Sequence, residues 1–201
     1  MVDDVKINEA DSSTREIIFL SAARLFSQKG YNGVSMRELA EQSGISKPAI
    51  YYYFGSKEGI YTSLVQMSFS YSEKFIKEIF NNSVAVKEKL ILLTKLHFDL
   101  SMQYPEFTKF LLTILSATDK LPFLDSLRKE AEKRRKLIAE LVKQGIEKGE
   151  FGASADPNLA AEIFIGSISH FLWKQVNSKK KILSNLLAEQ IVELLFKGLN
   201  E

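Results

Sequence analysis

The sequence predicts an all-α protein of about nine helices, and three observations predict it. Apolar residues recur at helical spacing along most of the chain, as Leu183, Leu187, Ile191 and Leu194 do near its end. No stretch alternates apolar and polar residues as a half-buried strand would. Each of the four prolines stands where a new helical pattern begins, and the first turn of a helix tolerates proline.

The first expected helix begins after Ser13 or Thr14, either of which can serve as its N-cap, and it ends before Gly30. Its expected apolar face consists of Ile17, Leu20, Ala23, Leu25 and Phe26. The next helix spans about 36–42, because Ser35 and Glu38 have the spacing of a capping box. It stops at Gly44, and Ser46 caps a further short helix over about 47–53.

Six more helices are expected after this first helix and the two short ones. Ser56 caps the first of the six, and Pro105, Pro122 and Pro157 mark later starts. Their expected spans are about 57–80, 86–103, 105–117, 122–148, 158–176 and 181–199.

Composition narrows the classes of function. The chain has 201 residues, of which 45% are hydrophobic, and a formal net charge of +2. It has no cysteine, which excludes disulfides, thiolate metal sites and thiol nucleophiles. No Ser/His/Asp set, phosphate loop, paired-carboxylate motif or metal-ligand spacing stands out, so we expect no enzyme, no cofactor and no metal. No apolar run reaches the roughly 18 residues of a membrane span, and the acidic start lacks the order of a signal peptide, so a cytoplasmic location is expected.

The span 14–61 contains the residues that indicate a function. Its two short helices, joined by Ser43-Gly44-Ile45, have the helix-turn-helix layout, in which the second helix can lie in the major groove of DNA. Positive charge also gathers here, because Ser12–Lys57 contains six cations and three anions. A helix-turn-helix can also be a structural element that binds no DNA. The alternative functions are then an adaptor or an enzyme on an all-α scaffold, and a DNA-binding test would distinguish them from a DNA-binding protein.

The span resembles the TetR (tetracycline repressor) family of transcriptional regulators. The resemblance rests on residues 14–17, 22–23, 25–26, 29–31, 34–40, 43–47, 50–54 and 56–58, about a quarter of the chain. It implies a three-helix DNA-binding domain at 13–56 and a six-helix ligand-binding and dimerisation domain at 57–201, preceded by a flexible tail at 1–12. The residues that match the DNA-contacting positions of the family are Ser35, Met36, Arg37, Ser46, Lys47, Pro48, Ala49, Tyr51, Tyr52 and Lys57.

Two positions depart from the family pattern. Val34 stands where the family often has Thr, which removes one possible hydroxyl contact, and Pro48 stands where Gly is frequent. Both departures concern which operator is preferred more than whether DNA is bound.

The resemblance also implies an effector cavity among the middle helices. The residues expected to line it are Tyr71, Phe75, His97, Phe98, Phe107, Phe110, Leu111, His170 and Trp173. These side chains indicate a small, mainly apolar or aromatic effector. Periodicity does not separate a cavity wall from a packed core, so most of these aromatics can equally be core. The basic run 128–136 reads as a solvated helix face.

The last two helices have apolar stripes too wide for one buried face, and the resemblance implies that they pair with their copies in a homodimer. The expected interface residues are Ile163, Gly166, Ser167, Ile168, Phe171, Leu183, Leu187, Ile191, Leu194 and Leu195. Packing within one chain is the alternative. The expected mechanism is a repressor that binds a palindromic operator and is released when an effector shifts the spacing of its two recognition helices. The helix that begins at Lys57 links both domains and is the expected transmitter.

Overall fold

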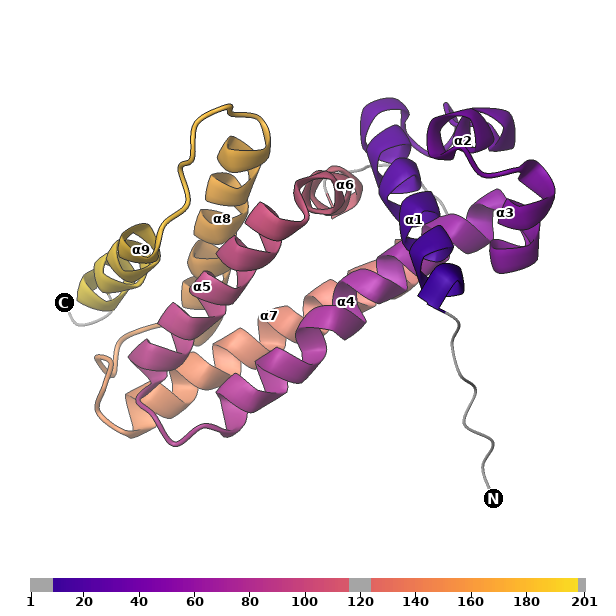
Figure 1. Cartoon of the computed structure of the whole chain (residues 1–201). Helices are drawn as coiled ribbons and strands as arrows, with labels where there is room; N and C mark the ends of the chain where they lie inside the picture. Colours follow the sequence, from indigo (N-terminus) through magenta and orange to yellow (C-terminus); the bar gives the residue numbers. More distant parts are fainter. Residues whose placement is uncertain (1–8, 116–123, 199–201) are drawn as a thin grey trace, which may run out of the picture.

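The computed structural model describes residues 9–115 and 124–198, and these residues form nine α-helices and no strand (Figure 1). The all-α prediction is therefore confirmed. The helices are α1 (Glu9–Lys29), α2 (Met36–Ser43), α3 (Lys47–Phe54), α4 (Lys57–Asn81), α5 (Val86–Gln103), α6 (Pro105–Leu115), α7 (Leu124–Glu147), α8 (Pro157–Val176) and α9 (Asn185–Gly198).

The capping signals of the two short helices are confirmed. The Glu38 backbone N–H donates to Ser35 Oγ at 3.2 Å, and the Ser35 N–H donates to Glu38 Oε2 at 3.0 Å, which completes the capping box. Gly44 ends α2 with φ 69°, a left-handed conformation that favours glycine. The hydroxyls of Ser46 and Ser56 accept the N-terminal hydrogen bonds of α3 and α4.

The expected beginning of the first helix is wrong. α1 begins at Glu9, so neither Ser13 nor Thr14 is its N-cap, and residues 9–12 of the predicted tail are helical. Residues 1–8 lie outside the described part of the chain. The predicted apolar face is confirmed for Ala23, Leu25 and Phe26 and wrong for Ile17 and Leu20, which are exposed. α1 instead buries a wide face against α2, α4 and α6, and this face consists of Ile18, Phe19, Ala22, Ala23, Leu25 and Phe26.

The expected start of the last helix at about 181 is also wrong, because α9 begins at Asn185. The side-chain oxygen of Gln175 accepts a hydrogen bond from the backbone N–H of Leu183 at 3.1 Å, which ties the connection to the end of α8. The Ser184 hydroxyl then accepts a hydrogen bond from the first turn of α9. The expected end at 117 and start at 122 of two other helices lie outside the described residues.

Two hydrophobic cores hold the molecule together. The first joins α1, α2, α3 and the start of α4 to α6, and it includes Phe110, Ile114 and Leu127 from beyond the predicted DNA-binding segment. The second joins α5, α7, α8 and α9. The three N-terminal helices therefore share their core with α4 and α6. In Figure 1 they lie at one end of the molecule, and α8 and α9 lie toward the other.

Candidate nucleic-acid interface and ligand site

Helix α3 divides its side chains between the core and the solvent. Ile50 and Phe54 are buried against the first core. Tyr51 and Tyr52 point the other way and are 47% and 84% exposed, beside the exposed Lys47. Two exposed aromatic rings keep apolar surface in contact with water, which is unfavourable in the free protein. Their rings and hydroxyls suit contacts with thymine methyl groups and DNA phosphates. The structure thus turns the predicted recognition residues outward; Pro48 and Ser46 are exposed too, and Ala49 is half-buried.

The start of α2 offers a second polar surface. Ser35 is exposed at the helix N-terminus, where backbone N–H groups favour an anion. The Arg37 side chain is exposed and donates to Glu41 at 2.7 Å, so it would exchange this carboxylate for a phosphate on binding. Met36 is half-buried and packs partly against the first core. Lys29 lies 2.6 Å from Glu38 and, by donating a hydrogen bond, holds the pKa of this carboxyl below its ordinary value.

Lys57, at the first position of α4, points inward rather than outward. Its ammonium donates to the backbone carbonyls of Tyr31 at 2.9 Å and Val34 at 3.0 Å, and it lies 4.3 Å from the centre of the Tyr31 ring. These contacts tie α4 to the loop that leads into Ser35. The resemblance assigns Lys57 to a DNA phosphate, but in this structure two of its three donors hold the protein's own backbone.

We expect the Lys57→Met variant to separate these two roles. Removing a phosphate contact lowers the slope of log affinity against log salt by about 0.9 for each lysine lost. If Lys57 positions the loop, the slope stays close to that of the unchanged protein, while the free energy of unfolding falls by about 1–3 kcal/mol. Salt titrations of operator binding and denaturant melts give both numbers. If the slope instead falls by about 0.9 for each protomer, Lys57 contacts a DNA phosphate and the positioning role is contradicted.

The structure does not bring the expected cavity residues together. Phe110 is buried in the first core, with Phe107 and Leu111 packed beside it, whereas Phe98 is buried in the second core. The side chain of Tyr71 lies outside the described part of the molecule. Phe75, His170 and Trp173 are exposed. A single cavity lined by all nine is therefore wrong, because their helical phases point them to different cores and surfaces.

His97, on α5, is half-buried. Its Nδ1 lies 2.7 Å from the carbonyl oxygen of Leu93, a contact in which Nδ1 carries the proton. Burial disfavours the charged ring and lowers the pKa of His97, and the nearby Arg134 acts in the same direction. His97 is therefore a neutral polar group at neutral pH.

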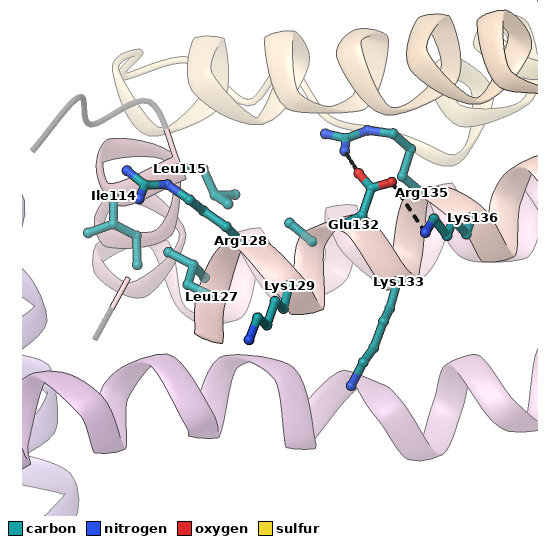
Figure 2. Close-up of a pocket in the computed structure, with 10 residues that line it drawn as sticks. Ile114, Leu115, Leu127, Arg128, Lys129, Glu132, Lys133, Arg135 and Lys136 are labelled. Carbon is teal, nitrogen blue, oxygen red and sulfur yellow. Dashed lines mark hydrogen bonds and ion pairs between the residues drawn. The ribbon is translucent and has the colours of Figure 1, made fainter. Parts of the chain in front are cut away.

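An open pocket of about 650 Å³ lies instead beside α7, at the end of α6 (Figure 2). Its walls combine apolar and basic side chains with the carboxylate of Glu132, and none of the nine expected residues is among them. The main lining residues are Ile114, Leu115, Leu127, Arg128, Lys129, Lys133 and Lys136. The sequence signal that could have found the basic wall was the run 128–136, which we interpreted as a solvated face.

The expected dimer residues divide into an exposed and a buried set. Ile163 and Leu194 are exposed by 50% and 71%, Gly166 is exposed, and Ser167 is half-buried. Ile168, Leu183 and Ile191 are wrong as interface residues, because they are buried in the second core. Phe171, Leu187 and Leu195 pack partly against the same core.

Helix α8 carries an exposed stripe, and only part of it was predicted as an interface. Leu159, Ile163, Gly166, His170 and Trp173 are all exposed and recur at spacings of three and four residues, so they share one face. Leu186 extends the exposed apolar surface on α9. This spacing was visible in the sequence, and the burial of the opposite face of α8 shows which phase is free.

Comparisons with known proteins agree with this architecture. Residues 18–64 match the family described as "Bacterial regulatory proteins, tetR family". The chain is 24% identical over 181 residues to the fatty acid metabolism regulator protein of Bacillus subtilis, an alignment that covers 90% of this chain and 92% of that protein.

Two solved structures have the same fold. One is the transcriptional regulator FadR of Bacillus subtilis in complex with stearoyl-CoA, with a TM-score of 0.74, 23% identity, and coverage of 91% of this chain and 98% of that one. The other is AibR in complex with isovaleryl coenzyme A and operator DNA, with a TM-score of 0.69, 22% identity, and coverage of 93% and 98%. Within 9–115 and 124–198, no helix is long and apolar enough to cross a membrane, and no group of His, Asp and Glu could hold a metal ion.

Proposed function

We propose that this chain, whose residues 18–64 match the tetR family of bacterial regulatory proteins, is a homodimeric, effector-released repressor of transcription. The observation that carries the proposal is the two-sided α3 helix, with Ile50 and Phe54 anchored in the core and Lys47, Tyr51 and Tyr52 presented to solvent. A scaffold helix has no need of this outer set. We place the protein in the cytoplasm and assign it no enzymatic activity.

Two groups of residues contact the operator: one positions the protein on the DNA backbone, and the other contacts the bases. Ser35 and Arg37 at the start of α2, and Ser46 and Lys47 at the start of α3, supply phosphate contacts that set the register on the duplex. Tyr51 and Tyr52 lie one turn further along α3 and reach the base edges in the major groove. Two such helices in a dimer, about 34 Å apart, read the two halves of a palindrome.

The dimer is supported by the exposed apolar surface of α8 and α9. Ile163, Trp173 and Leu194 are each at least half exposed and lie on helices far from α3 (Figure 1). A second copy of the chain would remove this surface from water. Gly166 has no atom within 4 Å of the position of an added Cβ, which leaves room for a partner helix to approach.

The effector belongs, in this proposal, to the coenzyme A thioesters of fatty acids. The relatives with the same fold hold stearoyl-CoA and isovaleryl coenzyme A. An effector that binds better to a form of the dimer with another spacing between its recognition helices releases the operator by its difference in affinity. This replaces the general expectation of a small apolar or aromatic molecule by one with an apolar chain and an anionic head.

Two helices can carry the signal between the domains. α4 is tied to the loop between α1 and α2 by the Lys57 contacts. α6 packs against α1, and Phe110 contacts the Phe26 and Tyr61 rings at centroid distances of 6.3 and 5.1 Å. The first of these was expected from the sequence, whereas the route through α6 becomes apparent only from the packing.

We expect Tyr51→Ala and Lys47→Ala each to weaken operator binding, by about tenfold or more for the tyrosine, since both protomers lose the contact. Binding to DNA from upstream of the protein's own gene can be followed by gel shift or fluorescence anisotropy. The Lys47→Ala protein should bind all DNA sequences more weakly by the same factor. The Tyr51→Ala protein should also show a smaller ratio of its affinity for the operator to its affinity for random DNA. Lys143→Ala, an exposed lysine on α7, is the matched control. Unchanged binding by a folded, dimeric Tyr51→Ala protein would contradict the proposed interface.

A further inference from the structure

The pocket beside α7 has an apolar floor. Ile114, at the end of α6, and Leu127, near the start of α7, are both nearly fully buried, yet both line the pocket. Leu115 adds a half-exposed side chain to the same wall. The volume of about 650 Å³ lies within the range of about 300–1,000 Å³ that small-molecule sites occupy.

The remaining wall is mainly basic, and Glu132 is the one carboxylate among the lining residues. Lys129, Lys133 and Lys136 project from α7, and Figure 2 shows Lys129 and Lys133 reaching away from the helix on the side that faces α4. Lys129 has no ion pair among the described residues. The other two contact acidic neighbours on their own helix, Lys133 at 2.5 Å and Lys136 at 3.9 Å, and such exposed pairs exchange partners at little cost.

We propose that this pocket binds the phosphorylated head of an acyl coenzyme A, with Lys129, Lys133 and Lys136 on its phosphates. Three exposed ammonium groups beside an apolar floor suit a molecule that combines several negative charges with an apolar chain. Neither a neutral aromatic molecule nor a free inorganic anion uses both walls. The inference deepens the proposed function by giving its effector a site.

The position of this pocket would connect the ligand to DNA binding. Ile114 and Leu127 belong to the same core as Ile18 and Phe26 of α1. An acyl chain that enters beside them displaces side chains on which the DNA-binding helices are seated. Because close-packed cores change arrangement rather than deform smoothly, a small displacement there can move α1 and the helices attached to it.

Direct titration tests the site without DNA. Purified full-length protein is titrated by calorimetry with stearoyl-CoA, free coenzyme A, stearate and stearoyl lysophosphatidic acid. We expect stearoyl-CoA to bind most tightly, because it alone offers the acyl chain and the several phosphates of the coenzyme. We expect Lys129→Gln/Lys133→Gln to lower its affinity by about tenfold and to leave stearate unaffected.

The matched control is Lys143→Gln/Lys148→Gln, which removes the same charge from exposed positions further along the chain. If both double variants lose the same affinity for stearoyl-CoA, the loss comes from the change in net charge, and the proposed site is overturned. Tighter binding of lysophosphatidic acid than of stearoyl-CoA would assign the pocket to a phosphorylated lipid and overturn the coenzyme. If stearoyl-CoA fails to bind the unchanged protein, both this site and the proposed effector class are overturned, whereas operator binding by the same preparation still tests the proposed repressor function separately.

Discussion

Ile163→Arg/Leu194→Arg is expected to turn the dimer into monomers and to lower operator affinity by about a hundredfold or more. Two linked recognition helices gain affinity because the second half-site is bound at high effective concentration, and this gain reaches about 10²–10⁴. Placing arginine on both copies of a two-fold interface brings like charges together in a surface that excludes water. Analytical ultracentrifugation measures the mass, and fluorescence anisotropy measures the operator affinity.

The variant should remain folded, because both side chains are largely exposed in one protomer and neither fills a core. Leu137→Arg supplies the matched control: Leu137 is an exposed leucine on α7, outside the α8–α9 surface. We expect it to leave both the mass and the operator affinity unchanged. A double variant that still sediments as a dimer would show that another surface joins the protomers.

The second large effect is expected from Phe110, the aromatic residue through which α6 contacts the DNA-binding helices. Phe110→Ala should lower the free energy of unfolding by about 3–5 kcal/mol, because a fully buried ring leaves a cavity among Phe26, Tyr61 and Phe107. Chemical denaturation measures this loss. Phe98→Ala, an equally buried phenylalanine in the second core, should cost a similar amount.

Coupling between effector and operator should distinguish these two positions. The milder Phe110→Leu keeps most of the packing and is expected to reduce the ratio of operator affinities without and with effector, whereas Phe98→Leu preserves it. Stability alone would affect both variants alike. If the two variants keep the same ratio as the unchanged protein, α6 does not transmit the signal, and the α4 route through Lys57 remains.

Short-range features of the fold were predictable from the sequence. The capping box of Ser35 and Glu38 and the stop at Gly44 depend on residues within one turn of each other, so their hydrogen bonds follow from spacing alone. The outward direction of Tyr51 and Tyr52 agrees with their predicted role as DNA contacts, and the buried Ile50 and Phe54 occupy the other side of α3. These local signals, combined over the span 14–61, carried the resemblance to the TetR family, whose family model matches residues 18–64.

Features that depend on distant neighbours were predicted less well. Ile17 and Leu20 looked like core residues, but the positions of α2, α4 and α6 around α1 selected a different face. Ile168 and Ile191 looked like interface residues, but the packing of α8 and α9 against α5 and α7 buried them. In both helices more than one apolar face was available, and periodicity does not say which face meets a neighbour.

The sequence by itself determined the helices, most of their caps and the helix-turn-helix, because each depends on residues a few positions apart. Only the tertiary structure decided what Lys57 holds, which side of α8 is free and where the pocket lies. Lys57 reaches carbonyls more than twenty residues away, and the pocket joins the end of α6 to the side of α7. Such contacts form when separate helices pack, and their partners are not encoded in local spacing.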